Sequence, residues 1–351
     1  MDGRERVLTA LDGGTPDRVP RALGFGRVEI KELAPAGEYR DDLIDVQFIR
    51  FGPWPANEEL RRLIKPYPLD TRLGTAEQAA TYQRWDYHPE TPNQRNPLAH
   101  ARSLDDLRDF PFPDADMPDD VEELTRQVEG LHASGLAAGG NLPHLGGELF
   151  EAAWRLRGLE SFLLDMIERP EWAHHLLGRL TDMALVTAEA MARTGADVLA
   201  LSDDIGMPRT MMMSPRHWRE FFKPRMAAII QAARAVNPDM RVLYHSDGYY
   251  EPVIADLMEI GVDAINPLQP EHMDAARIRR RFGPRPVLWG TVGHHTTLAL
   301  ARPEDIRREV KLRIETLGRA GLVICPAYDI YGAASRWENV AAFLEAAEEY
   351  G

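Results

Sequence analysis

His245, Asp247 and Cys325 are the residues of this sequence that could most readily bind a metal ion. His245 and Asp247 stand two positions apart after a short apolar run, and Cys325 ends another such run. Imidazole, carboxylate and thiolate groups are all ligands of Zn²⁺, and a catalytic zinc keeps one coordination position open. A His-x-Asp pair also occurs by chance, and a lone cysteine often serves as a small buried apolar residue. The spacing alone therefore leaves both interpretations open.

Polar residues follow the neighbouring apolar runs in the same way. Asp203 and Asp204 come directly after the run 198–202. Such a pair could act as acid, base or ligand, although adjacent carboxylates also cap backbone groups or face water. We predict catalytic roles for Asp203, Asp204 and Asp247. The candidate substrate-binding residues stand at or just after the ends of the later runs: Asn266, Gln269, Trp289 and Tyr328.

The elements that must position these residues alternate between short apolar strands and amphipathic helices. Strands are predicted at 136–140, 198–201, 241–245, 262–266, 287–289 and 322–325, and helices at 4–11, 119–134, 149–157, 159–167, 171–193, 215–235, 250–260, 274–282, 303–318 and 337–350. This alternation is typical of parallel strands joined by crossover helices, and catalytic residues of such barrels follow the carboxyl ends of the strands. We therefore predict an α/β fold, a single distorted (β/α)8 TIM barrel over residues 1–351, with an irregular proline-rich elaboration or lid at 26–118.

The composition excludes several classes of partner. The chain has 351 residues and a formal net charge of −14, which disfavours nucleic acids and anionic membranes because phosphates need a basic face. A single cysteine cannot form an internal disulfide. The sequence shows neither the apolar core of a signal peptide nor an apolar run long enough to cross a membrane. We therefore expect a cytoplasmic protein.

Several stretches resemble the uroporphyrinogen decarboxylase superfamily. They are R-E-R-V-L-T-A-L-D-G-G-T-P-D-R-V-P at 4–20, G-A-D-V-L-A-L-S-D-D-I-G and M-S-P-R-H-W-R-E-F-F-K-P-R within 195–225, H-S-D-G-Y-Y-E-P-V-I-A-D-L-M-E-I-G-V-D-A-I-N-P-L-Q-P at 245–270, L-W-G at 288–290 and C-P-A-Y-D-I at 325–330. The resemblance covers most of the chain outside 26–118. It implies a distorted (β/α)8 barrel with the active site at the carboxyl ends of the strands.

One branch of this superfamily consists of zinc-dependent, corrinoid-linked methyltransferases that resemble the methylcobalamin:coenzyme M enzymes. Their zinc is bound by H-x-C and a distant cysteine. His245 and Cys325 match two of these ligands, Asp247 stands where the first cysteine would be, and Glu148 is the candidate fourth ligand. The resemblance thus implies Zn²⁺ and a methyl transfer between a small thiol, ether or amine and a corrinoid. Because no D-x-H-x-x-G motif occurs, the corrinoid is expected on a separate partner protein; a homodimer is also possible.

Two other functions remain open. The first is a metal-independent decarboxylase of a carboxylated small molecule, with Asp203 stabilising developing charge. The decarboxylase signature R-Q-A-G-R is absent, and only Arg21 and Arg27 stand in the corresponding region. The second is a binding module on a barrel that has lost its chemistry. Zinc content separates the methyltransferase from the decarboxylase, whereas a binding module predicts that removing the polar groups at the strand ends stabilises the fold without changing any turnover.

Overall fold

The structure is a computed structural model. It describes residues 1–26, 28, 34–35, 42–51, 96–112, 115–142, 147–293, 297–298, 300–327, 330 and 336–351.

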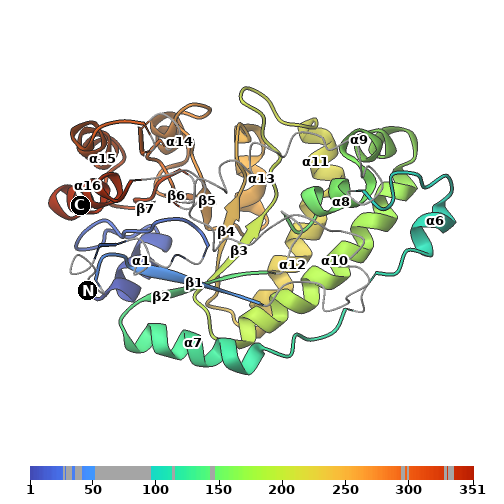
Figure 1. Ribbon diagram of the computed structural model, residues 1–351, viewed down its shortest axis with the longest axis horizontal. Coiled ribbons are helices and arrows are strands. Elements are labelled where there is room, and N and C mark those ends of the chain that lie inside the picture. The colour runs from blue at the N-terminus through green and yellow to red at the C-terminus, as the bar shows by residue number, and fades with distance from the viewer. Residues whose placement is uncertain are drawn as a thin grey trace.

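Seven parallel strands form one curled sheet with the order β1-β2-β3-β4-β5-β6-β7 (Figure 1). The strands are β1 (Val46–Arg50), β2 (Ala137–Asn141), β3 (Val198–Ser202), β4 (Arg241–His245), β5 (Ala264–Asn266), β6 (Val287–Trp289) and β7 (Leu322–Val323). Because neighbours in the chain are neighbours in the sheet, each crossover runs to the adjacent strand. The α/β class and the parallel sheet predicted from the sequence are confirmed, and the curl of the sheet is consistent with a TIM-like barrel.

Residues 20–22 lie between the two edge strands of this sheet. Arg21 forms a parallel bridge with Ile324, and the amide of Ala22 donates to the carbonyl of Ile324 at 3.0 Å. On the other side the amide of Asp45, just before β1, donates to the carbonyl of Arg21 at 2.9 Å. This segment therefore hydrogen-bonds next to β7 on one side and next to β1 on the other. A complete eight-stranded barrel stays a prediction.

The sequence-based prediction for 26–118 was wrong at 46–50. These residues form β1, an integral strand that pairs with β2 in register from Val46 opposite Ala137 to Arg50 opposite Asn141. The strand was missed because it is short and lies in a proline-rich context that normally interrupts regular structure. The same region also contains the short helix α6 (Leu104–Arg108). Most of the remaining predicted elaboration lies outside the described residues.

Helices cover the outside of the sheet, with α7 below it and α10 and α12 beside it in the view of Figure 1. The predicted helix 215–235 is divided into α11 and α12, because Pro224 has no amide hydrogen for a continuous helix. The other helices besides α6 are α1 (Gly3–Leu11), α7 (Val121–Ala133), α8 (Phe150–Arg157), α9 (Leu159–Glu168), α10 (Pro170–Arg193), α11 (Pro215–Phe221), α12 (Lys223–Val236), the 3-10 helix η1 (Glu251–Val253), α13 (Ile254–Glu259), α14 (Ala275–Phe282), α15 (Pro303–Leu317) and α16 (Trp337–Tyr350). Among the described residues, no helix is long and apolar enough to span a membrane.

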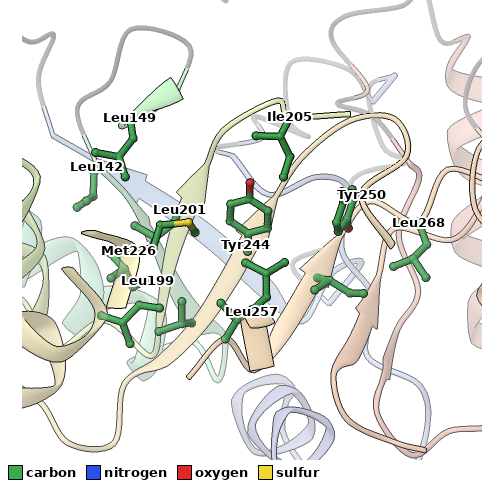
Figure 2. Packing of buried hydrophobic residues seen from close by; sticks show 14 of the residues in the cluster. Leu142, Leu149, Leu199, Leu201, Ile205, Met226, Tyr244, Tyr250, Leu257 and Leu268 are labelled. Carbon is green, nitrogen blue, oxygen red and sulfur yellow. The ribbon is translucent and has the colours of Figure 1, made fainter. Parts of the chain in front are cut away.

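Alternation along the strands creates two apolar layers. Leu199, Leu201 and Tyr244 belong to the layer shared with the helices, as Figure 2 shows. Val198 and Ala200 alternate with them and belong to a separate inner cluster. A period of two residues places every second side chain of a strand inside the curl. The same period determines which polar side chains lie on the inner face of the sheet at the carboxyl ends of the strands.

Candidate metal centre

Asp204, His245 and Asp247 come together at the carboxyl ends of β3 and β4. Ser202 pairs with His245 in the sheet, and Asp204 and Asp247 each follow two residues later. A step of two keeps the same side of a strand, so both carboxylates follow inward-facing positions. One ligand atom from each of the three residues lies within 4.8 Å of the others. His245 Nε2 is 3.6 Å from Asp204 Oδ1 and 4.0 Å from Asp247 Oδ1.

The orientation of His245 is set by Asn266. His245 Nδ1 lies 2.6 Å from Asn266 Oδ1, and Asn266 Nδ2 donates to the backbone carbonyl of Trp289 at 3.2 Å. Because the carbonyl can only accept, the amide nitrogen of Asn266 must face it and the amide oxygen must face His245. His245 Nδ1 is therefore the donor of this bond, which leaves Nε2 facing the two carboxylates. A fixed tautomer of this kind is typical of a metal-binding histidine.

We expect Asn266→Ala to weaken metal binding by about 10- to 100-fold, because the imidazole loses the partner that fixes its tautomer and ring plane. Isothermal titration of the apo protein with Zn²⁺ measures this change. Asn266→Asp is the matched variant, since it retains an acceptor for Nδ1 and should bind metal more tightly than the alanine variant. Equal affinities for wild type and Asn266→Ala would contradict the assigned orientation.

Asp247 is held by Gln269 and by the backbone of the neighbouring loop. Gln269 Nε2 donates to Asp247 Oδ1 at 3.1 Å, and Gln269 Oε1 accepts from the amide of Gly248 at 2.7 Å. The amide of Asp247 donates to Asp204 Oδ1 at 2.7 Å. Asn266 and Gln269, predicted to bind substrate, thus contact the candidate ligands. Their contact with substrate stays a prediction.

The loops after β3 and β4 approach closely enough to require glycine. A Cβ on Gly206 would lie 2.2 Å from the carbonyl oxygen of Asp247, and Gly248 has a φ of 78°. Met207 and Tyr249 form an antiparallel bridge beside this contact. Side chains at these two glycine positions would push the loops apart and separate the carboxylates.

Asp203 faces away from the cluster and towards the start of α8. Its carboxylate accepts from the amide of Leu149 at 3.1 Å and from that of Glu151 at 2.9 Å. These are amides that a helix start leaves without an internal acceptor. Burial raises the pKa of Asp203 to about 8, with the Glu151 carboxylate also raising it and the backbone bonds opposing the shift. The predicted catalytic aspartate therefore caps a helix.

Glu148, the predicted fourth ligand, is buried beside Asp203. Glu148 Oε2 accepts from the amide of Ser202 at 2.6 Å, whereas the buried Oε1 has no hydrogen-bond partner among the described atoms. Burial, reinforced by the charge of Asp203, raises the pKa of Glu148 well above its usual range. Glu148 is outside the group of ligand atoms within 4.8 Å. A metal role for it stays a prediction.

We expect the Glu148→Gln variant to become more stable relative to wild type as the pH rises. The folded-state pKa of Glu148 lies above the unfolded value of about 4.3, so wild-type stability is lost as pH rises through the folded value. Glutamine keeps the acceptor and has no proton to lose. Urea unfolding from about pH 5 to pH 9 should show the variant gaining relative stability at the alkaline end. If the difference in unfolding free energy between variant and wild type did not change with pH, the raised pKa of Glu148 would be contradicted. Loss of bound metal from the Glu148→Gln variant would support the prediction that Glu148 is a ligand.

Cys325 is completely buried and belongs to the inner cluster with Trp289. Its Sγ donates to the carbonyl of Gly24 at 3.7 Å, and Trp289 Nε1 donates to the same oxygen at 3.2 Å. Neither contact is with the candidate ligands, and the cluster does not contain Cys325. The residue after Gly24 is Phe25, which was not among the predicted site residues; its ring stacks on His245 at 3.8 Å and 17°. Its G-F-G setting, typical of close backbone approach, is the signal that could have found it.

The remaining site prediction, Tyr328, lies outside the described residues, as does Arg27. Arg21 is described and is directed away from the cluster. Its nearest carboxylates are those of Asp45 at 3.8 Å and Glu348 at 3.6 Å, and its Nη2 donates to the carbonyl of Asp42. Next to the cluster, the buried carboxylate of Glu151 accepts from the amide of Asp204 at 3.4 Å.

Comparison with curated proteins gives matches to two activities. The methylcobamide:CoM methyltransferase MtaA of Methanosarcina barkeri is 26% identical over 196 residues, which are 56% of this chain and 54% of that protein. The chain thus spans about half the length of this relative. A uroporphyrinogen decarboxylase of Xanthomonas euvesicatoria pv. vesicatoria is 25% identical over 336 residues, covering 89% of this chain and 87% of that protein.

The fold and the family are shown by two further comparisons. A solved structure described as a methyltransferase from Methanosarcina mazei aligns with a TM-score of 0.67 and 20% identity, covering 100% of this chain and 99% of that one. At this identity the match shows the fold. The family model described as uroporphyrinogen decarboxylase (URO-D) matches residues 90–350, most of the chain. The resemblance inferred from the sequence is confirmed: the chain belongs to the uroporphyrinogen decarboxylase family.

Proposed function

We propose that this protein is a metal-dependent methyltransferase that moves a methyl group between a small thiol, ether or amine and a corrinoid carried on a separate protein. The observation that carries the proposal is the arrangement of Asp204, His245 and Asp247, with Nε2 of His245 facing the two carboxylates. A metal ion bound among these three groups would accept a lone pair from Nε2 and be stabilised by both carboxylates. The similarity to the Methanosarcina barkeri methyltransferase supports methyl transfer as the reaction.

The donor set fits Zn²⁺, which accepts imidazole nitrogen and carboxylate oxygen. Asp204, His245 and Asp247 would hold it, and Cys325 stays a candidate further ligand. When bound, zinc acts as a Lewis acid that makes a coordinated thiol or hydroxyl easier to deprotonate. Two carboxylates make a harder ligand set than two thiolates, so an oxygen-bearing substrate is compatible with this site.

The chain's own residues orient and support this centre. Asn266 keeps the proton of His245 on Nδ1, and Gln269 fixes Asp247. The amide of Asp247 holds Asp204 Oδ1 in place. Asp204 is the more exposed of the two carboxylates, with 37% of its side chain accessible, so it can also take up a proton released by the substrate.

Metal removal is expected to abolish methyl transfer reversibly. Protein treated with a chelator and dialysed should no longer demethylate methylcobalamin in the presence of thiol acceptors, and stoichiometric Zn²⁺ should restore the rate. Methyl transfer in the opposite direction, from a small molecule to the corrinoid, is tested by incubating the protein with a reduced corrinoid and aryl ethers or methylamines. Activity that survives complete metal removal would refute the proposal.

A decarboxylase is the second candidate, because the relative that covers 89% of this chain is a uroporphyrinogen decarboxylase. The charge of the site counts against a polycarboxylate substrate. The cluster itself contributes two aspartates, and Arg21 pairs with Asp45 and Glu348 instead. A less highly charged acid remains compatible. Carbon dioxide release that is insensitive to chelators would favour this reaction.

A further inference from the structure

The imidazole of His245 is contacted at both edges and on one face. Asn266 Oδ1 lies 2.6 Å from Nδ1 at one edge, and Nε2 at the other edge faces Asp204 and Asp247. The ring of Phe25 covers one face, with the two ring centroids 3.8 Å apart and the planes 17° from parallel. A single hydrogen bond at Nδ1 allows the ring to tilt about the axis of that bond. The contact on the face therefore decides the plane in which Nε2 points.

The backbone around Phe25 is fixed by hydrogen bonds to several strands. The carbonyl of Gly24 accepts from Trp289 Nε1, at the end of β6, at 3.2 Å. The carbonyl of Phe25 accepts from Asn141 Nδ2, at the end of β2, at 3.1 Å. The preceding residues 20–22 hydrogen-bond next to β7 on one side and next to β1 on the other. Because its backbone is held in this way, the phenyl ring forms a fixed surface against which the imidazole packs.

The parallel stack of Phe25 on His245 is an arrangement that two neutral aromatic rings do not favour. The π electrons make both faces negative, so such pairs prefer offset or edge-to-face packing with centroids about 4.5 to 7 Å apart. The two centroids are closer than this. An imidazole whose Nε2 binds a metal cation loses electron density, and the negative face of a phenyl ring then attracts it. The stack is thus more favourable for a metal-bound imidazole than for a free one.

We propose that Phe25 is a positioning residue of the metal centre: stacked on His245, it fixes the plane of the imidazole and favours the metal-bound form of that ring. Asn266 sets the direction of Nδ1, and Phe25 sets the tilt of the ring. Together they hold Nε2 towards Asp204 and Asp247. This inference rests on the proposed function, since it assumes a metal at the cluster.

Titration of the apo protein with Zn²⁺ tests the effect of Phe25 on metal binding. We expect Phe25→Leu to bind Zn²⁺ about 2- to 10-fold more weakly than wild type, because leucine keeps apolar bulk but has no ring to stack. Phe25→Tyr keeps the ring and should bind Zn²⁺ as tightly as wild type. Wild-type affinity in Phe25→Leu, or equally weakened binding in both variants, would overturn the inference.

Phe343→Leu is the control for a general loss of stability. It makes the same substitution at a fully buried phenylalanine of α16, in the apolar layer shared with the helices. This variant should keep the wild-type affinity for Zn²⁺, and circular dichroism should show native secondary structure for all three variants. If Phe343→Leu weakened Zn²⁺ binding as much as Phe25→Leu, a structural effect would explain both, and the inference would be overturned.

Proton NMR of the apo protein supplies a readout that needs no metal. Protons in front of an aromatic face are shifted upfield by its ring current, so the imidazole protons of His245 should resonate upfield in wild type. Their signals are assigned by their loss in His245→Ala. At constant pH we expect them to move downfield in Phe25→Leu and to stay upfield in Phe25→Tyr. Signals that do not move in Phe25→Leu would contradict the stack and with it the inference.

The two proposals fail in different ways. If wild type binds no Zn²⁺ at all, the proposed metal-dependent function fails, and this inference fails with it. If Zn²⁺ binds in a manner that depends on His245, while Phe25→Leu changes neither the affinity nor the imidazole signals, only the role of Phe25 is refuted.

Discussion

His245→Ala is expected to lose stoichiometric metal and, with it, methyl transfer. The variant keeps Asp204 and Asp247, but removes the nitrogen donor that the described residues bring to the cluster. Removing a residue that merely supports a ligand lowers metal affinity by about 10- to 100-fold, so loss of the ligand itself should exceed about 100-fold. Elemental analysis after dialysis measures metal content, and methylcobalamin demethylation measures turnover.

His100→Ala is the matched control, because His100 is exposed and the cluster does not include it. This variant should retain both metal and activity. Circular dichroism should show native secondary structure for both variants. A His245→Ala protein that keeps stoichiometric zinc would place the metal elsewhere, and one that keeps zinc-dependent activity would refute the proposed centre.

The sequence predicts the position of the centre because strand period and strand order are local properties. The runs at 198–201 and 241–245 are apolar, β-forming and bounded by turns, so the residue pattern alone locates their carboxyl ends. Parallel neighbours then bring Asp204 beside His245 and Asp247. The same reasoning correctly placed Asn266 at the end of a strand adjacent to His245.

The roles within the centre depend on contacts that the sequence does not encode locally. Asp203 and Asp204 are chemically identical neighbours beyond the end of β3, yet one contacts the start of α8 and the other faces the cluster. Cys325 has the expected inward position, but a carbonyl from residue 24 accepts its hydrogen bond. That contact joins residues about 300 positions apart, and periodicity carries no information on such pairs.

Because Asp203 caps a helix and Asp204 faces the cluster, alanine substitutions at these two neighbouring positions should have opposite effects on stability and on metal binding. Asp203→Ala leaves the buried amides of Leu149 and Glu151 without their acceptor. We expect it to lower the free energy of unfolding by about 2 kcal/mol, since each unsatisfied buried amide is costly while removal of a buried carboxyl offsets part of the loss. The folded variant should still bind one metal ion. Urea unfolding and elemental analysis measure the two effects.

Asp204→Ala should show the reverse pattern. Its side chain is 37% exposed, so water can replace it as the acceptor for the Asp247 amide, and the unfolding free energy should change by less than about 1 kcal/mol. Metal affinity should instead fall by more than about 100-fold, because a ligand is lost. If Asp203→Ala lost metal while remaining folded, Asp203 would belong to the centre. If Asp204→Ala retained metal at full affinity, the cluster would need a different third ligand, and Cys325 would be the first residue to test.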